Sequence, residues 1–327
     1  MPPFPAARML GIYLLGIVFG VFAMSPIASA EIKKQTLTYK KVGALEIKAD
    51  VFREADDQPR GVVVWIHGGA LIMGHREGVP QRLKDAMLES GLILVSIDYR
   101  LAPETQLPEV IADLEDALAW VHDRGPELFH ADPERIAVCG GSAGGYLTLT
   151  AGFRVKHRPR ALVAFWGYGD LLDSWYSEPS PHPRHNAKKF TREQAYEQVK
   201  SPPISDARDR PGDGGIFYNW CRQTGEWPKA VTGWDPKKDA KKFHPYMPMK
   251  NVTKDYPPTL LIHGEKDTDV PHFESAKMAA QLSRHRVEHR LISLPNAEHG
   301  LEGGDKAQID AAYREAFEFL RLKLVPR

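Results

Sequence analysis

The sequence has little that would mark a disulfide-rich, nucleic-acid-binding or membrane-spanning protein. It contains only two cysteines among 327 residues, and Cys139 ends a predicted buried strand, which favours packing over a disulfide. The formal net charge is +1 and no long block of like charge occurs, which argues against a nucleic-acid partner. There is no internal repeat. With 43% hydrophobic residues, the chain has the composition of a globular protein with one large core.

The first thirty residues differ from the rest. A weakly positive start with Arg8 precedes an apolar run over residues 9–24, which Ser25 and Pro26 interrupt. Ala28-Ser29-Ala30 then supplies the small residues that a signal peptidase requires. The run is shorter than the roughly 20 residues that span a bilayer. We therefore predict a signal peptide over residues 1–30, and an exported protein, periplasmic or extracellular, without stable membrane insertion. An uncleaved membrane anchor is the alternative.

From residue 32 onward the pattern alternates strands and helices. Continuous β-branched runs such as 61–66 (GVVVWI) are typical of strands buried on both faces of a parallel sheet. We expect strands at 35–39, 45–52, 61–66, 92–97, 135–139, 161–166, 259–263 and 287–294, and helices at 80–90, 108–123, 143–153, 271–283 and 306–322. The first two strands are predicted to form an edge hairpin. The expected fold class is α/β, a mostly parallel central sheet with helices on both faces.

The alternation stops between about residues 170 and 256, where proline, glycine, tryptophan and tyrosine are abundant. A structureless loop of about 85 residues is uncommon within a compact domain. We therefore predict one domain over residues 31–327 with a cap inserted at about 170–256, above the carboxyl edge of the sheet. Its aromatic residues suit either a small core of the cap or stacking on a sugar or phenolic group.

A candidate nucleophile lies between a predicted strand and a predicted helix. Residues 140–145 read GGSAGG, with Ser142 at the centre. A serine on such a sharp turn needs small neighbours, and the helix N-terminus behind it favours developing negative charge. The alternative is a glycine-rich turn that only packs tightly or holds a phosphate. It would not account for the further motifs described below.

A second glycine pair follows the strand at 61–66. Two glycines at the carboxyl end of a strand let backbone N–H groups turn toward a substrate oxygen. We predict an oxyanion hole formed by the amides of Gly69 and Ala70, with that of Ala143 as a third donor. His67, just before the glycines, is predicted to hold the loop and not to act as a base.

The predicted general base and its partner acid follow the last two strands. Asp267 comes soonest after the strand at 259–263 and is the preferred acid. Asp269, the alternative acid, precedes Val270-Pro271 and is expected to cap the next helix. His299 follows the last strand on a loop and completes the order Ser…Asp…His. We predict Ser142, Asp267 and His299 as the catalytic residues. His182 and His185 have no acidic or cysteine partner nearby in sequence, so we expect no metal and no cofactor.

These motifs together resemble the hormone-sensitive-lipase-like carboxylesterases and the bacterial feruloyl and acetyl esterases. The matching segments are 67–70 (HGGA), 98–104 (DYRLAPE), 140–145 (GGSAGG), 267–271 (DTDVP) and 298–300 (EHG). The resemblance implies the α/β-hydrolase fold, ester hydrolysis without a cofactor, and Ser142, Asp267 and His299 as the triad. It also implies a network of Arg100 and acids behind the oxyanion loop. Ala70 and Gly141 depart from the lipase-like branch, and Gly141 favours the feruloyl and acetyl esterases.

The sequence thus predicts a serine carboxylesterase that acts through an acyl-enzyme on short-acyl esters, with acetylated or feruloylated carbohydrate as candidate substrates. A small serine exopeptidase of the prolyl-oligopeptidase type shares the turn from Asp267 to Val270 and is one alternative. A ligand-binding protein on a non-catalytic hydrolase scaffold is another, although such proteins usually lack a triad residue.

Overall fold

The structure, a computed structural model, describes residue 1 and residues 31–325. The predicted signal peptide lies almost entirely outside the described residues, so both its cleavage and the export of the protein stay predictions. Within the described part of the chain, no helix combines the length and the apolar character needed to cross a membrane.

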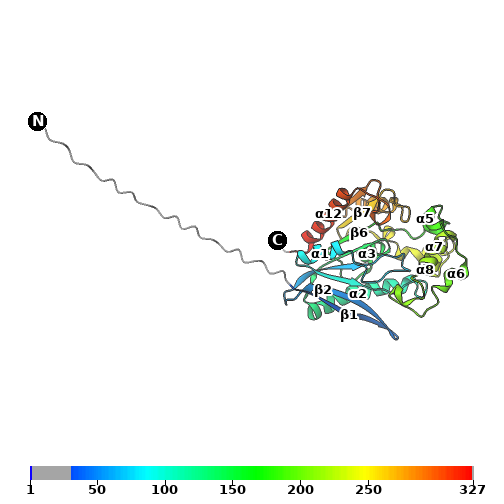
Figure 1. Cartoon of the computed structure of the whole chain (residues 1–327), viewed down its shortest axis with the longest axis horizontal. Coiled ribbons are helices and arrows are strands. Elements are labelled where there is room, and N and C mark those ends of the chain that lie inside the picture. Colours follow the sequence, from blue (N-terminus) through cyan, green and yellow to red (C-terminus); the bar gives the residue numbers. More distant parts are fainter. Residues whose placement is uncertain (2–30, 326–327) are drawn as a thin grey trace. The chain divides into compact units, whose positions relative to one another are not determined.

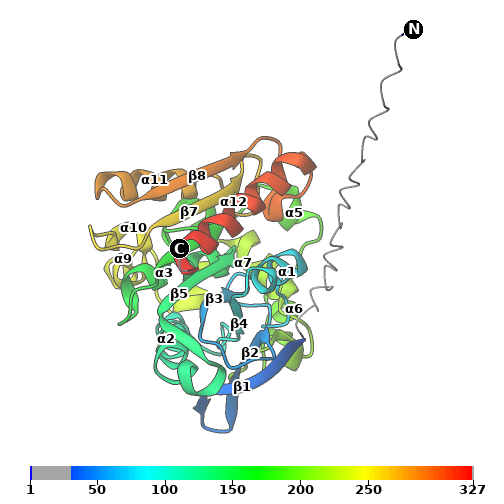
Figure 2. The same cartoon turned by 90° about the vertical axis from the view of Figure 1, so that its left-hand side faces the viewer.

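An eight-stranded sheet forms the centre of the domain, in the order β1-β2-β4-β3-β5-β6-β7-β8 (Figures 1 and 2). The strands are β1 (Ile32–Val42), β2 (Leu45–Glu54), β3 (Arg60–Ile66), β4 (Ile93–Ile97), β5 (Ala131–Gly141), β6 (Ala161–Phe165), β7 (Thr259–Gly264) and β8 (His289–Leu294). β1 and β2 form an antiparallel edge hairpin, β2 pairs antiparallel with β4, and all other pairs are parallel. The predicted α/β fold with a mostly parallel sheet is confirmed.

Helices cover both faces of the sheet because its central strands are apolar on both sides. In β3, Val62 and Val64 belong to one core cluster and Val63 to the other, as the two-residue period of a strand requires. The first cluster takes in residues of α2 (Leu107–Phe129), α3 (Ala143–Arg154) and α11 (Phe273–Arg284). The second includes residues of α1 (Gln81–Glu89) and α12 (Lys306–Leu324).

Helix α2 extends six residues beyond its predicted end at residue 123. Pro126 lies inside the helix, where it removes one backbone hydrogen bond. Gly125 and Phe129 both belong to the buried face of α2, so packing against the sheet continues through the proline. Tertiary packing here overrides the local signal for a helix end.

The segment between β6 and β7 contains helices and no strand. Most helices are short: α4 (Ser174–Ser177), α5 (Pro183–Asn186), α6 (Arg192–Glu197), α7 (Gly215–Thr224), α8 (Trp227–Thr232), α9 (Ala240–Phe243) and α10 (Pro248–Asn251), with 3₁₀ turns at Ala207–Asp209 and His244–Tyr246. Helices α5 to α8 gather at one end of the domain (Figure 1). Tyr176, Phe217 and Trp227 are buried, so many of the aromatic residues of this segment pack in the core. We call residues 170–256 the cap.

Both cysteines are free and buried. Cys139 packs in the cluster on one face of the sheet and Cys221 in the cluster on the other. The expectation that Cys139 serves in packing is therefore confirmed. Burial raises the pKa of both thiols well above that of an exposed cysteine.

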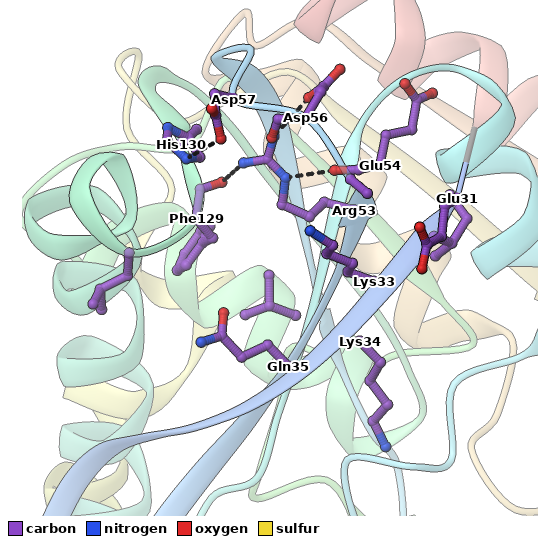
Figure 3. A pocket seen from close by; sticks show the side chains of 14 residues that line it. Glu31, Lys33, Lys34, Gln35, Arg53, Glu54, Asp56, Asp57, Phe129 and His130 are labelled. Atoms are coloured by element: carbon purple, nitrogen blue, oxygen red, sulfur yellow. Dashed lines mark hydrogen bonds and ion pairs between the residues drawn. The ribbon is translucent and has the colours of Figure 1, made fainter.

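One hollow of about 550 Å³ lies at the amino edge of the sheet, beside the ends of β2 and α2 (Figure 3). The groups around it satisfy one another: Arg53 donates to the carbonyl of Glu54 at 2.9 Å and to the carboxylate of Asp56 at 2.8 Å. His130 lies 3.4 Å from Asp57. Because β2 runs antiparallel to β4, this hollow lies opposite the carboxyl edge where β5 ends, and we assign it no ligand.

Candidate active site

Ser142 occupies the sharp turn between β5 and α3. Its φ is 57° and its ψ is −120°, a conformation that non-glycine residues rarely adopt. Close packing holds it there, because a Cβ on Gly144 would lie 2.0 Å from the carbonyl oxygen of Ile66 in β3. The amide of Ser142 donates to the carbonyl of Phe165 at the end of β6, at 2.9 Å. The turn leaves the Ser142 side chain partly exposed above the carboxyl edge of the sheet.

The structure brings Ser142, His299 and Asp267 together although 157 positions separate the first two in sequence. Nε2 of His299 lies 3.1 Å from Oγ of Ser142, and its Nδ1 lies 2.8 Å from Oδ2 of Asp267. His299 follows β8, and its own amide donates to the Glu298 carboxylate at 2.8 Å. These distances form one continuous chain of hydrogen bonds from a buried carboxylate to a serine hydroxyl.

Asp267 is oriented by its own loop after β7. Its Oδ1 accepts from the amides of Asp269, at 2.9 Å, and Val270, at 2.8 Å. Its Oδ2 faces His299 and lies 3.3 Å from Nε2 of His263. Burial would raise the pKa of Asp267, but hydrogen bonds from His263 and His299 hold it below its usual value. Asp267 is therefore an ionised acceptor at neutral pH.

The electrostatic surroundings of His299 favour its protonated form. Burial lowers the pKa of the imidazole, but the hydrogen bond to Asp267 and the charge of Asp269 outweigh this and raise it. Arg184 acts in the opposite direction. A histidine that is stabilised as imidazolium by a neighbouring carboxylate can take a proton from a hydroxyl and return it later.

The predicted oxyanion loop lies directly beside Ser142. A Cβ on Gly68 would lie 2.9 Å from the carbonyl oxygen of Gly141, which shows how closely the loop approaches the turn. Gly69 and Ala70 both have positive φ, 102° and 57°. Within residues 31–325, the N–H groups of Gly69, Ala70 and Ala143 donate no hydrogen bond, as the predicted oxyanion role requires.

His67 stabilises this loop through a backbone contact and through ring stacking. Its Nδ1 lies 2.8 Å from the carbonyl oxygen of Gly68, and its ring stacks on Tyr99 with centroids 4.3 Å apart. Burial lowers the pKa of His67 to about 4, so it is neutral at physiological pH. These contacts agree with the predicted structural role.

The implied pairing of Arg100 with acidic residues is present, and its partner lies on α2. Arg100 pairs with Asp113 of α2 at 2.8 Å. Arg210 of the cap adds a second arginine near this loop, donating to the carbonyls of Ile72 and Ala102 and to the carboxylate of Glu104. Sequence reasoning missed this arginine because 106 positions separate it from Glu104 and no periodic pattern surrounds it.

Asp269 does not cap the following helix, which corrects the prediction; the N-cap of α11 is His272. Oδ1 of Asp269 accepts hydrogen bonds from three cap residues: Nε2 of His185 at 2.9 Å, Nη1 of Arg222 at 2.8 Å, and the hydroxyl of Tyr218. Although burial raises the pKa of Asp269, the bond from His185 and the charges of His299 and Arg222 hold it well below its usual range. A permanent negative charge therefore lies next to the triad.

The two cap histidines do not form a metal site together. Both ring nitrogens of His185 are engaged, one with Asp269 and the other with Oγ of Ser180 at 2.8 Å. The ring of His182 accepts from the amide of Arg184 at 3.2 Å and so caps helix α5. A separate group, His122, Asp123 and His157, has ligand atoms within 4.8 Å of one another and contains no residue of the triad.

This sheet, with a strained serine at the carboxyl end of β5 and a histidine and an aspartate on later loops, defines an α/β-hydrolase. The chain belongs to the BD-FAE family, an esterase family of the feruloyl-acetyl type, whose model matches residues 50–282.

Sequence relatives include parts of much larger fungal enzymes. Over 340 residues the chain is 28% identical to the non-reducing polyketide synthase adrD of Penicillium rubens, a match that covers 88% of this chain and 14% of the synthase. It is 27% identical to the non-reducing polyketide synthase mapC' of Penicillium brevicompactum, covering 91% of this chain and 16% of that protein. The chain thus spans about one seventh of the length of these relatives.

Solved structures agree with the fold. A protein of unknown function from Staphylococcus aureus aligns with a TM-score of 0.70 and 21% identity, covering 89% of this chain and 98% of that one. A carbohydrate esterase from gut microbiota has a TM-score of 0.64 and 19% identity over 90% of this chain and 97% of its own. Thermogutta terrifontis esterase 2, phosphorylated by paraoxon, aligns with a TM-score of 0.63 and 18% identity, covering 90% of this chain and 96% of that one. At these identities the similarity shows the fold alone.

Because Asp269 raises the pKa of His299, the Asp269→Asn substitution is expected to lower that pKa. An NMR titration of the His299 ring should give a pKa above the unperturbed value of about 6.5 in the wild type and a lower value in the variant. Asp57→Asn, at the opposite edge of the sheet, is the control and should leave the titration unchanged. An unchanged pKa in Asp269→Asn would contradict the electrostatic role of Asp269.

Proposed function

We propose that this protein is a serine carboxylesterase that works through an acyl-enzyme formed on Ser142. The observation that carries the proposal is the chain of hydrogen bonds from Asp267 through His299 to Ser142, at 2.8 and 3.1 Å. Membership of an esterase family and the free amides beside Ser142 support it further.

The reaction has two halves with the same geometry. Oγ of Ser142 attacks the ester carbonyl carbon while Nε2 of His299 takes the hydroxyl proton, and Asp267 stabilises the imidazolium. The carbonyl oxygen becomes an oxyanion held by the amides of Gly69, Ala70 and Ala143. The ester C–O bond then breaks, and the leaving alcohol takes the proton from His299. Water, deprotonated by His299, attacks the acyl-enzyme, releases the carboxylic acid and restores Ser142.

We propose short-acyl esters as the substrate class, with acetylated or feruloylated carbohydrate as candidates. Two structural relatives are described as a carbohydrate esterase and as an acetyl ester-xyloside bifunctional hydrolase, which supports this class. The packing near the oxyanion loop supports a short acyl group. Trp227 donates to the carbonyl of Ala70 at 3.1 Å, is fully buried, and stacks on Tyr176 with ring centroids 3.8 Å apart, so large aromatic side chains pack tightly next to the loop.

Ser142→Ala is expected to lower kcat for ester hydrolysis by at least about 10³-fold, because the nucleophile is lost while the oxyanion amides remain. The measurement is the release of nitrophenol from an acetyl ester, together with labelling by a fluorophosphonate probe, which the substitution should abolish. Ser174→Ala, at an exposed serine of the cap, should retain both properties. Full activity in Ser142→Ala would disprove the proposed mechanism.

Nitrophenyl acetate and butyrate are expected to give kcat/KM values at least about tenfold above that of the palmitate ester, because a long chain would have to displace packed aromatic side chains. Initial rates on the three esters at concentrations below micelle formation provide the test. A preference for palmitate would show that the cap opens an apolar channel and would exclude the short-acyl assignment.

A further inference from the structure

The two carboxylate oxygens of Asp269 face different surroundings. Oδ1 is occupied by the three cap donors His185, Tyr218 and Arg222. Oδ2 lies 3.8 Å from Nε2 of His299, and no group among residues 31–325 donates a hydrogen bond to it. The side chain of Asp269 is 15% exposed. One oxygen thus anchors the residue to the cap while the other remains an open acceptor beside the triad.

The cap holds Asp269 firmly in this orientation. Arg222 is 2% exposed, and its guanidinium lies 5.0 Å from the ring centroid of Tyr176 and 5.4 Å from that of Trp175. The backbone amide of Asp269 is also fixed, because it donates to Asp267. Because Oδ2 is not fully buried and accepts no hydrogen bond from residues 31–325, it can accept one from a bound substrate.

Oδ2 borders the place of the leaving alcohol. In the proposed mechanism the alcohol oxygen receives its proton from Nε2 of His299, so an atom 3.8 Å from that nitrogen lies next to the alcohol oxygen. A hydroxyl on the adjacent carbon of the alcohol can donate to a carboxylate so placed. An apolar group there would leave the carboxylate without a donor, and an anionic group would be repelled.

We propose that Asp269 is a specificity-determining residue that accepts a hydrogen bond from a hydroxyl next to the scissile ester. The preferred substrates are then monoesters of 1,2-diols, an arrangement found in partly acylated polyols and sugars. This inference rests on the proposed function, since it takes His299 as the acid that protonates the leaving alcohol.

The probe pair is 2-hydroxyethyl acetate and 2-methoxyethyl acetate, which differ mainly in the donor hydrogen. Acetate release in a pH-stat gives kcat/KM for each ester, and the ratio of the two cancels any general change in activity. In the wild type the ratio is expected to favour the hydroxyethyl ester by about tenfold or more, as for a hydrogen bond to a charged group.

Asp269→Asn sharpens the test because the three cap donors require the amide oxygen in the Oδ1 position. The NH₂ group then replaces Oδ2 and turns an acceptor into a donor, so the ratio should fall to about one or below. Asp269→Ala, which has no side-chain oxygen, should also lose the preference and serves if the Asn variant does not fold. Asp57→Asn, at the opposite edge of the sheet, is the control and should keep the preference for the hydroxyethyl ester.

A wild-type ratio near one, or a ratio unchanged in both Asp269 variants, would overturn the inference about Asp269. Hydrolysis of both esters that persists in Ser142→Ala would instead contradict the proposed function. The two failures are therefore distinguished by different variants.

Discussion

The backbone of Ser142 is the constraint on which the rest of the site depends. Helix α3 packs so tightly against β3 that only a hydrogen fits at position 144, and this packing holds Ser142 at a φ of 57°. Such a conformation costs about 1–3 kcal/mol and persists only where the surrounding structure enforces it. The buried strands β3, β5 and β6 provide that enforcement, and in return the serine oxygen lies beside the amides of the loop after β3.

The cap is part of the site as well as a cover. Each of three cap residues contacts a different part of the carboxyl edge: Trp227 the carbonyl of Ala70, Arg210 the carbonyl of Ile72, and Arg222 the carboxylate of Asp269. The first two contacts hold the loop that carries the predicted oxyanion donors. The third places a charge next to His299. Substitutions inside the cap core therefore change the geometry of the reacting groups as well as the space for substrate.

Local sequence signals were sufficient for the sheet and for the three side chains that the structure joins by hydrogen bonds. Continuous β-branched runs predict buried strands. The turn at the serine has strict steric requirements, so its amino-acid sequence and its place between a strand and a helix identify it. Asp267 and His299 follow from chain order, because the carboxyl ends of parallel strands meet at one edge. The structure places His299 within hydrogen-bond distance of both Asp267 and Ser142.

The contacts that sequence could not predict join positions far apart in the chain. Trp227 and Ala70 are 157 positions apart, and Arg222 and Asp269 are 47 apart, with no periodic pattern to connect them. Asp269 was misread because aspartate before a helix is so often a cap. Only the folded arrangement shows that three buried donors of the cap turn its side chain toward the triad instead.

The most direct test of the central claim is the mass of the covalent intermediate. The protein is mixed with an ester whose acyl group hydrolyses slowly, quenched in acid within the first turnover, and digested for peptide mass spectrometry. The acyl mass is expected on the peptide that contains Ser142, and on Ser142 itself. An acyl group on another residue, or turnover without any covalent adduct, would contradict it.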